Sequence, residues 1–105
     1  MIDDHRIKLI FNHYGQESQL GKMIEEANEL KEATRDLLYL IKAYQGLDRA
    51  ERIAQAKRHL AEEIADVRIM AEQLLFGFDL FDECEQQIAF KLARQMKRME
   101  TSKHE

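Results

Sequence analysis

The feature that most constrains the fold is the near absence of residues that interrupt helices. The chain has 105 residues, no proline and only four glycines. It is rich in alanine, leucine, isoleucine, glutamate, lysine, glutamine and arginine, which favour helix over other structures. Gly15, Gly46 and Gly77 divide the chain into segments long enough for substantial helices, whereas Gly21 lies inside one of them. We therefore predict an all-α fold.

Hydrophobic periodicity predicts four helices in a single domain spanning residues 1–105. Apolar residues recur at spacings of three and four in each segment, which places them on one helix face. We expect a first helix to begin after Asp3 or Asp4 and to end at Gly15, and a second to run from about 16–18 to about 44. A third is expected from Asp48, its N-cap, to about 76, and a fourth follows Asp79. The expected architecture is bundle-like, with the two long central helices antiparallel.

The last expected helix has an apolar face and a basic C-terminal half. We expect its inward residues to be Phe81, Cys84, Ile88, Leu92 and Met96. The long helices carry more apolar surface than a chain of this size can readily cover. The sequence therefore predicts a homodimer or homotetramer.

Charge and composition narrow the classes of partner and compartment. The net charge of −4 argues against a nucleic-acid-binding surface, which normally has a basic excess. The single cysteine, Cys84, cannot form an internal disulfide, which fits a reducing cytoplasm. No apolar run approaches the length of about 18 residues that spans a membrane, and the acidic N-terminal residues do not resemble a signal peptide. We expect a soluble, cytoplasmic protein.

A carboxylate in the middle of an apolar stripe is the strongest chemical signal. The stripe on the third expected helix consists of Ala56, Leu60, Glu63, Val67, Met70 and Leu74. A buried, unpaired carboxylate costs several kcal/mol or becomes neutral. Glutamate runs commonly lie on solvated helix faces, but that explanation does not account for Glu63.

The second expected helix offers a matching pair of carboxylates. Glu26 stands at the edge of an apolar face, and Glu29 lies one turn further on, as Asp66 does from Glu63. Four carboxylates from two helices require a cation between them and suit a hard, oxygen-seeking ion such as magnesium.

Other metal centres fit the sequence less well. A di-iron bundle would use Glu-x-x-His on two helices, and His5, His13, His59 and His104 all lack a glutamate three positions earlier. A zinc site would use clustered cysteine and histidine. Cys84 is expected to be a small core residue rather than a nucleophile.

The paired acidic motifs carry a family resemblance. Glu25-Glu26-x-x-Glu29 is followed by Glu63-x-x-Asp66, with a lead-in from Tyr14 to Lys22 and a basic-apolar pattern, Lys91-Leu92-x-Arg94, near the end. In these features the chain resembles the all-α nucleoside triphosphate pyrophosphohydrolases, the MazG-like family. The resemblance extends from about residue 7 to about residue 98.

The resemblance implies hydrolysis of a nucleoside or deoxynucleoside triphosphate to the monophosphate and pyrophosphate, and with it a role in cleansing the nucleotide pool. It implies Mg²⁺ as the cofactor, with Mn²⁺ as an alternative, and Glu26, Glu29, Glu63 and Asp66 as metal ligands. Glu25 would be the catalytic base for the attacking water, a ligand for a further ion, or a group supporting the ligands.

Substrate contacts can also be assigned to residues. Lys91, Arg94 and Lys22 are candidates for binding phosphates. Lys91 and Arg94 could equally be ordinary solvated residues of the last helix, and Lys22 could instead pair with Glu26. Phe11, Tyr14 and Gln19 are candidates for binding the base, although Phe11 and Tyr14 also fit the core. The alternative to an enzyme is a non-catalytic helical oligomer with a regulatory or scaffold role.

Overall fold

The computed structural model describes residues 2–103 and places them in four α-helices. These are α1 (Asp4–Tyr14), α2 (Gln16–Lys42), α3 (Arg49–Gly77) and α4 (Phe81–Lys103). Residues 2–103 contain no strand. The predicted all-α fold is confirmed, and the helix boundaries lie within a few residues of those expected.

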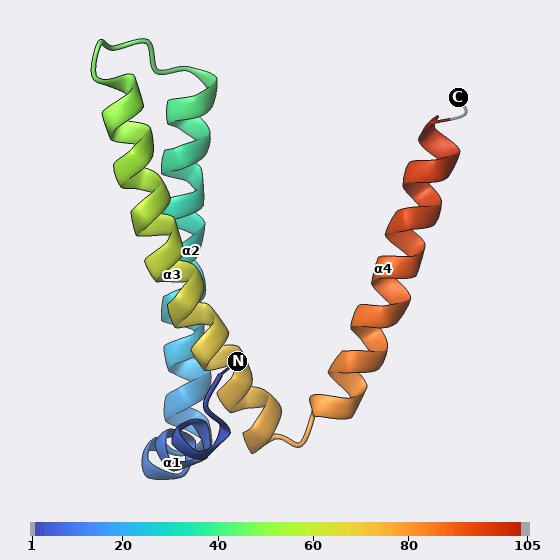
Figure 1. The fold of residues 1–105 in the computed structure, drawn as a ribbon. Coiled ribbons are helices and arrows are strands. Elements are labelled where there is room, and N and C mark those ends of the chain that lie inside the picture. The colour runs from blue at the N-terminus through green and yellow to red at the C-terminus, as the bar shows by residue number, and fades with distance from the viewer. Residues whose placement is uncertain (1, 104–105) are drawn as a thin grey trace.

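The two long helices, α2 and α3, form the centre of the molecule. They lie side by side along most of their length and are connected at one end by residues 43–48 (Figure 1). The short helix α1 packs at the other end, mainly against α3. This pair of helices brings residues 26–29 opposite residues 63–66, although they are distant in sequence.

Helix α1 begins and ends as its sequence predicts. Asp3 is the N-cap, and its carboxylate accepts a hydrogen bond from the backbone N–H of Arg6. Gly15 follows the helix with a φ of 89°, a left-handed conformation that glycine adopts without steric penalty. The chain can therefore turn from α1 directly into α2.

The connection between α2 and α3 differs from the prediction in one detail. Asp48 precedes α3, but its side chain makes no capping bond to the helix. Its carboxylate instead accepts hydrogen bonds from the Tyr44 hydroxyl at 2.5 Å and from Arg52 at 2.7 Å. Arg49 donates to the carbonyls of Ile41 and Tyr44, at 2.9 and 3.0 Å. These carbonyls lie at the end of α2 and past it, so a side chain from the start of α3 satisfies them.

The hydrophobic core is small, and its largest part lies where α1 meets α3. The ring of Phe11 is buried and contacts the rings of Phe76 and Phe78 edge to face, with centroids 5.9 and 6.2 Å apart. It also packs directly on Gly77, where any side chain would collide with the ring. The buried hydrophobic residues of the described chain are Ile7, Phe11, Ala33 and Met70.

The residues of α2 that are buried against α3 differ from those that its apolar spacing predicts. The residues of this helix that recur at spacings of three and four predict an inward stripe of Leu20, Met23, Ala27, Leu30, Thr34, Leu37, Ile41 and Tyr44. Ala27 and Ile41 are exposed, however, whereas Glu26 and Ala33 are buried. Glu26 is therefore in the middle of the packed face and not at its edge. On α3, the buried position near the end of the stripe is Gln73 and not Leu74.

Helix α4 lies apart from the other three (Figure 1). The expected inward residues Phe81, Ile88, Leu92 and Met96 are all exposed, so the predicted inward face is wrong for the single chain. Asp79 is not the N-cap residue, because α4 begins at Phe81 and Asp79 adopts a positive φ of 54°. The radius of gyration is 17.8 Å, whereas a compact chain of this length has about 13 Å.

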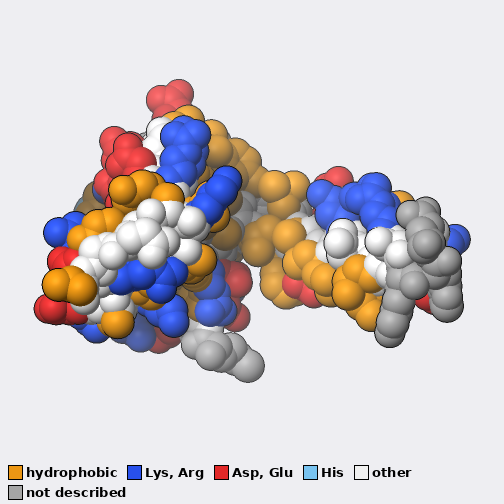
Figure 2. Space-filling view, turned by 90° about the horizontal axis from the view of Figure 1, so that it is seen from above, with side chains coloured by type: hydrophobic (Ala, Val, Ile, Leu, Met, Phe, Trp, Pro, Cys, Tyr) orange, Lys and Arg blue, Asp and Glu red, His pale blue; other side chains and the backbone are white. Residues whose placement is uncertain are grey.

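The surface of α4 is amphipathic. Hydrophobic and basic side chains occupy different sides of this helix (Figure 2). Within residues 2–103, no helix is both long and apolar enough to cross a membrane.

Candidate metal centre

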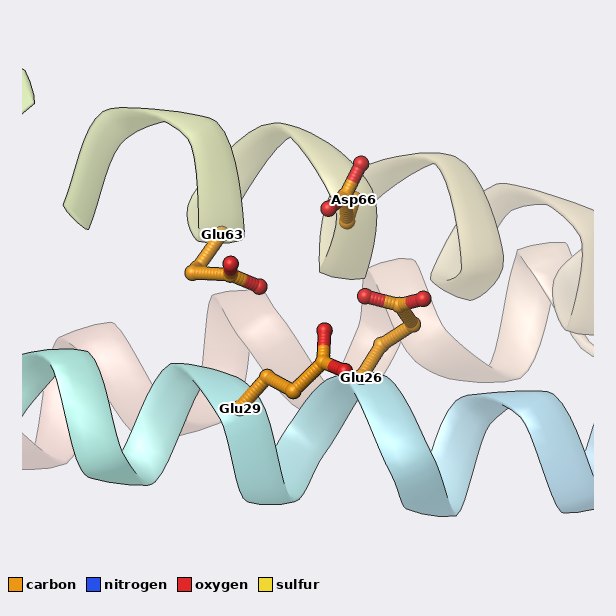
Figure 3. Close-up of side chains that lie close together, drawn as sticks. All are labelled: Glu26, Glu29, Glu63 and Asp66. Carbon is orange, nitrogen blue, oxygen red and sulfur yellow. The ribbon is translucent and has the colours of Figure 1, made fainter. Parts of the chain in front are cut away.

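Four carboxylates meet between α2 and α3, and we call Glu26, Glu29, Glu63 and Asp66 the acidic cluster. One carboxylate oxygen from each lies within 4.8 Å of the others. Glu26 and Glu29 come from α2, and Glu63 and Asp66 come from α3 (Figure 3). The spacing of three residues places each pair one turn apart on the helix face that meets the partner helix.

Two members of the acidic cluster are buried, and one carboxylate oxygen of each lacks a hydrogen-bond partner among the described residues. Glu26 is 7% exposed and Glu63 is 8% exposed. The Oε2 atoms of both residues lack a hydrogen-bond partner among the described residues. Buried polar atoms are almost always paired, so these two carboxylate oxygens are available to a cation or a water molecule.

The electrostatic environment of Glu26 reflects this arrangement. Burial is the main cause that raises the pKa of Glu26 above its ordinary value of 4.5. The nearby Lys22 ammonium opposes the rise in pKa, and the carboxylates of Glu29 and Asp66 add to it. A cation placed among these groups would remove the repulsion and favour the charged form.

Two basic side chains flank the acidic cluster, each one turn before a buried glutamate. Lys22 Nζ lies 3.3 Å from Glu26 Oε1 and 3.5 Å from Glu25 Oε2. His59 nitrogens lie 3.9 Å from oxygens of Glu62 and Glu63. Lys22 and Glu25 are mostly exposed and can move without disturbing the helix packing.

The residues present fit a divalent cation with hard, oxygen-preferring chemistry. All four donors are carboxylate oxygens, which suit Mg²⁺, Mn²⁺ and Ca²⁺ and not a soft ion. The two buried oxygens without partners point to a ligand independently of the negative charge. The exposed pair, Glu29 and Asp66, leaves the cluster open to solvent on one side.

A cavity of about 640 Å³ lies beside the acidic cluster, between α1, the start of α2 and the last third of α3. Lys22 and Glu25 form its boundary nearest the cluster. The rest of its wall combines apolar and polar residues: Ile10, Tyr14, Glu17, Ser18, Gln19, Gly21, Ile69, Met70 and Gln73.

The structure brings some of the expected substrate residues together and leaves others apart. Tyr14, Gln19 and Lys22 all line the cavity. Phe11 does not line this cavity and is 5% exposed in the core, which fits its alternative assignment. Lys91 and Arg94 lie on α4, away from the acidic cluster of the same chain (Figure 1).

Sequence reasoning did not identify Gln73 or His59 as parts of this region. Gln73 is three residues beyond Met70 on the inward face, so a polar residue on an apolar stripe was again the available signal. It was missed because Leu74 continued the apolar stripe equally well. His59 could have been found as the residue one turn before Glu63.

Comparison with known proteins identifies no similar protein. No protein-family model, curated protein or solved structure shows significant similarity to this chain.

Proposed function

We propose that the protein is a magnesium-dependent nucleotide pyrophosphohydrolase, with Mn²⁺ as an alternative ion. The observation that carries this proposal is the acidic cluster, in which two buried carboxylate oxygens have no partner among the described residues. A cavity large enough for part of a nucleotide adjoins it. A metal site next to a cavity with polar and apolar walls is a typical setting for a phosphorylated substrate.

Glu26, Glu29, Glu63 and Asp66 would hold the ion, and their oxygens are close enough to share one. Bound magnesium neutralises phosphate charge and lowers the pKa of a water molecule. Glu25 is exposed at the rim of the cavity and would accept the proton of the attacking water, or support a further ion. Lys22 would bind a phosphate oxygen once the ion has replaced it beside Glu26.

The substrate would be a nucleoside or deoxynucleoside triphosphate, cleaved to the monophosphate and pyrophosphate. The cavity supports this choice because its walls offer an aromatic ring, Tyr14, and the amides of Gln19 and Gln73. An aromatic face and amide groups are suited to a base. Clearing unwanted nucleotides would follow from such an activity.

We further propose that two or four chains assemble, with α2 and α3 as the antiparallel pair at the centre of each. The accessible surface is 8608 Å², whereas a folded monomer of 12.4 kDa has about 6,100 Å². The excess of about 2,500 Å² is larger than the area of about 800 Å² per partner in a standard interface. In such an assembly, Lys91 and Arg94 would act on phosphates bound by another chain.

The alternative function is a non-catalytic helical oligomer with a regulatory or scaffold role. The observation that favours it is the position of α4, because Lys91 and Arg94 do not approach the acidic cluster of their own chain. In this case the cation would serve only to join α2 and α3.

One screen separates the two functions. The purified protein is incubated with Mg²⁺ and each of the common ribo- and deoxynucleoside triphosphates, and pyrophosphate release is measured. The enzyme proposal predicts release from at least one substrate and its loss in Glu63→Gln. No release from any substrate, together with no Mg²⁺ binding by calorimetry, would exclude the enzyme proposal. Magnesium binding without turnover would favour the oligomer.

A further inference from the structure

The cavity contains a buried amide pair that the acidic cluster does not use. Gln19 Nε2 donates to Gln73 Oε1 at 2.7 Å, joining the first turn of α2 to α3. Gln19 is 5% exposed and Gln73 only 1% exposed, and both line the cavity. No other large side chain in residues 2–103 is buried as completely as that of Gln73.

The observed hydrogen bonds do not use all the donors and acceptors of the Gln19 and Gln73 amides. The other contact of Gln73 Nε2 within residues 2–103 is the Met70 sulfur at 3.6 Å, and a thioether is a weak acceptor. Gln19 Oε1 accepts a long bond of 3.3 Å from the Ser18 hydroxyl. Each amide nitrogen has two N–H groups, so the observed bonds occupy the pair only partly.

A purely structural role explains this arrangement poorly. A buried polar pair loses its hydration, and replacing both partners by apolar side chains of the same shape can be nearly neutral or stabilising. Partly satisfied polar networks are less favourable than an apolar core. A ligand edge with its own donors and acceptors would complete the pair.

Gly21 provides a separate observation on the same cavity. It lies inside α2, where glycine is less stable than alanine by about 0.5–1 kcal/mol. A Cβ added at Gly21 would meet no atom within 4 Å among the described residues, so the packing of this chain does not require glycine there. Gly21 lines the cavity, and its missing side chain leaves the helix backbone bare on that wall.

We propose that the Gln19–Gln73 pair reads the edge of the nucleotide base and that Gly21 leaves room for the substrate along α2. This inference rests on the proposed function, because it assigns the base half of the same site. The base would lie in the cavity with its polar edge toward the amide pair. Its phosphates would extend past Lys22 to the acidic cluster, which Lys22 contacts at 3.3 Å.

The first test replaces the amide without changing the size of the side chain much. Gln73→Met removes the polar recognition, and Gln55→Met is the matched control because Gln55 is exposed on the same helix. Binding is measured with Mg²⁺ for two probes: a non-hydrolysable analogue of the best-hydrolysed triphosphate, and inorganic tripolyphosphate, which has no base.

The proposal predicts that Gln73→Met weakens binding of the analogue about tenfold, the value of one well-formed hydrogen bond. Affinity for tripolyphosphate should stay unchanged. The KM values for the different triphosphates should become more alike, so that the variant distinguishes the bases less well, whereas kcat should change little. Unchanged analogue binding and unchanged base preference would show that the pair is structural and overturn the inference, while the proposed function would stand.

The second test holds even if Gln73→Met does not fold. Gly21→Ala should melt at a higher temperature than the wild type, and Gly21→Leu should fold but lose analogue binding while keeping tripolyphosphate binding. Ala27→Leu, an exposed position on the same helix outside the cavity, is the control. Full analogue binding by Gly21→Leu would overturn the inference. A wild type that binds neither probe and hydrolyses no triphosphate would overturn the proposed function and this inference together.

Discussion

The ammonium nitrogen of Lys22 lies 3.3 Å from a carboxylate oxygen of Glu26, one helical turn further along α2. Lys22 therefore places a positive charge beside a buried carboxylate, as a bound divalent ion would also do. In the proposed site, a divalent ion that binds Glu26 would compete with this ammonium group, and the lysine would then be free to contact a phosphate. The relation predicts opposite effects of one substitution on the two ligands.

Replacing Lys22 by methionine should strengthen Mg²⁺ binding and weaken nucleotide binding. Removing the ammonium group removes a competitor for Glu26, and because an exposed lysine is well solvated, the rise in Mg²⁺ affinity should be small. Calorimetric titration with Mg²⁺ alone, then with tripolyphosphate at saturating Mg²⁺, measures both effects. Lys31→Met, an exposed lysine on the same helix, is the control. Weaker Mg²⁺ binding by Lys22→Met would contradict competition.

Glu63→Gln tests whether this buried residue is a metal ligand. The amide has nearly the same shape but is a poor ligand for Mg²⁺, so most activity should be lost while the fold remains. Wild type should gain stability with Mg²⁺, by about 2.7 kcal/mol at 100 times Kd, and the variant should gain little. Thermal melts with and without Mg²⁺ measure the difference.

Glu62→Gln is the control for that experiment, because Glu62 is the exposed neighbour and faces His59 at a similar distance. Without metal, Glu63→Gln should melt at the same temperature as wild type or higher, since one repelling charge is removed. A variant that melts far lower, with a wild type indifferent to Mg²⁺, would mean that Glu63 is held by an ion pair.

The raised pKa of Glu26 predicts how stability changes with pH in the absence of metal. Because the folded protein holds this proton more tightly than the unfolded chain, stability falls as pH rises from about 4.5 through the folded pKa. Above both pKa values the loss is constant. Melts of wild type and Glu26→Gln between pH 4 and 8 should therefore diverge, with the variant relatively more stable at high pH. Parallel curves would contradict the raised pKa of Glu26.

Arg49→Ala should destabilise the connection between the long helices by about 1 kcal/mol, because two carbonyls at the end of α2 lose their donor. Chemical denaturation measures the change. Arg49→Lys should recover only part of the loss, since lysine cannot reproduce the planar fork of donors. Arg58→Ala, an exposed arginine on the same helix, should have little effect.

Assembly through α4 predicts a dimer or tetramer at micromolar concentration by sedimentation. Leu92→Glu combined with Met96→Glu should shift the protein toward monomer, because both side chains lie on the exposed apolar side of α4. Gln87→Glu adds charge about 140° around the helix from Leu92 and about 180° from Met96, and should leave the assembly intact. A wild type that is monomeric under these conditions would rule out this role of α4.

The sequence predicted those features that depend on residues close together in the chain. Asp3 and Gly15 were sufficient to place α1, and Glu63 on an apolar stripe was sufficient to identify an acidic residue facing α2. The position of α4 was not predictable. Its amphipathic pattern predicts that one side of the helix is covered, but does not show which element or which chain covers it. Gln73 was missed because an apolar pattern selects against polar residues, although a buried amide needs only one partner on the other helix.

The order of the helices along the chain has a consequence for biosynthesis. Every member of the acidic cluster belongs to α2 or α3, which are consecutive and lie side by side, whereas α4 is made after both of them. Contacts between neighbouring segments form early because little chain must be closed into a loop. The nascent polypeptide could thus close its two long helices around an ion while α4 is still inside the ribosome. The ion would then bind before the subunits associate.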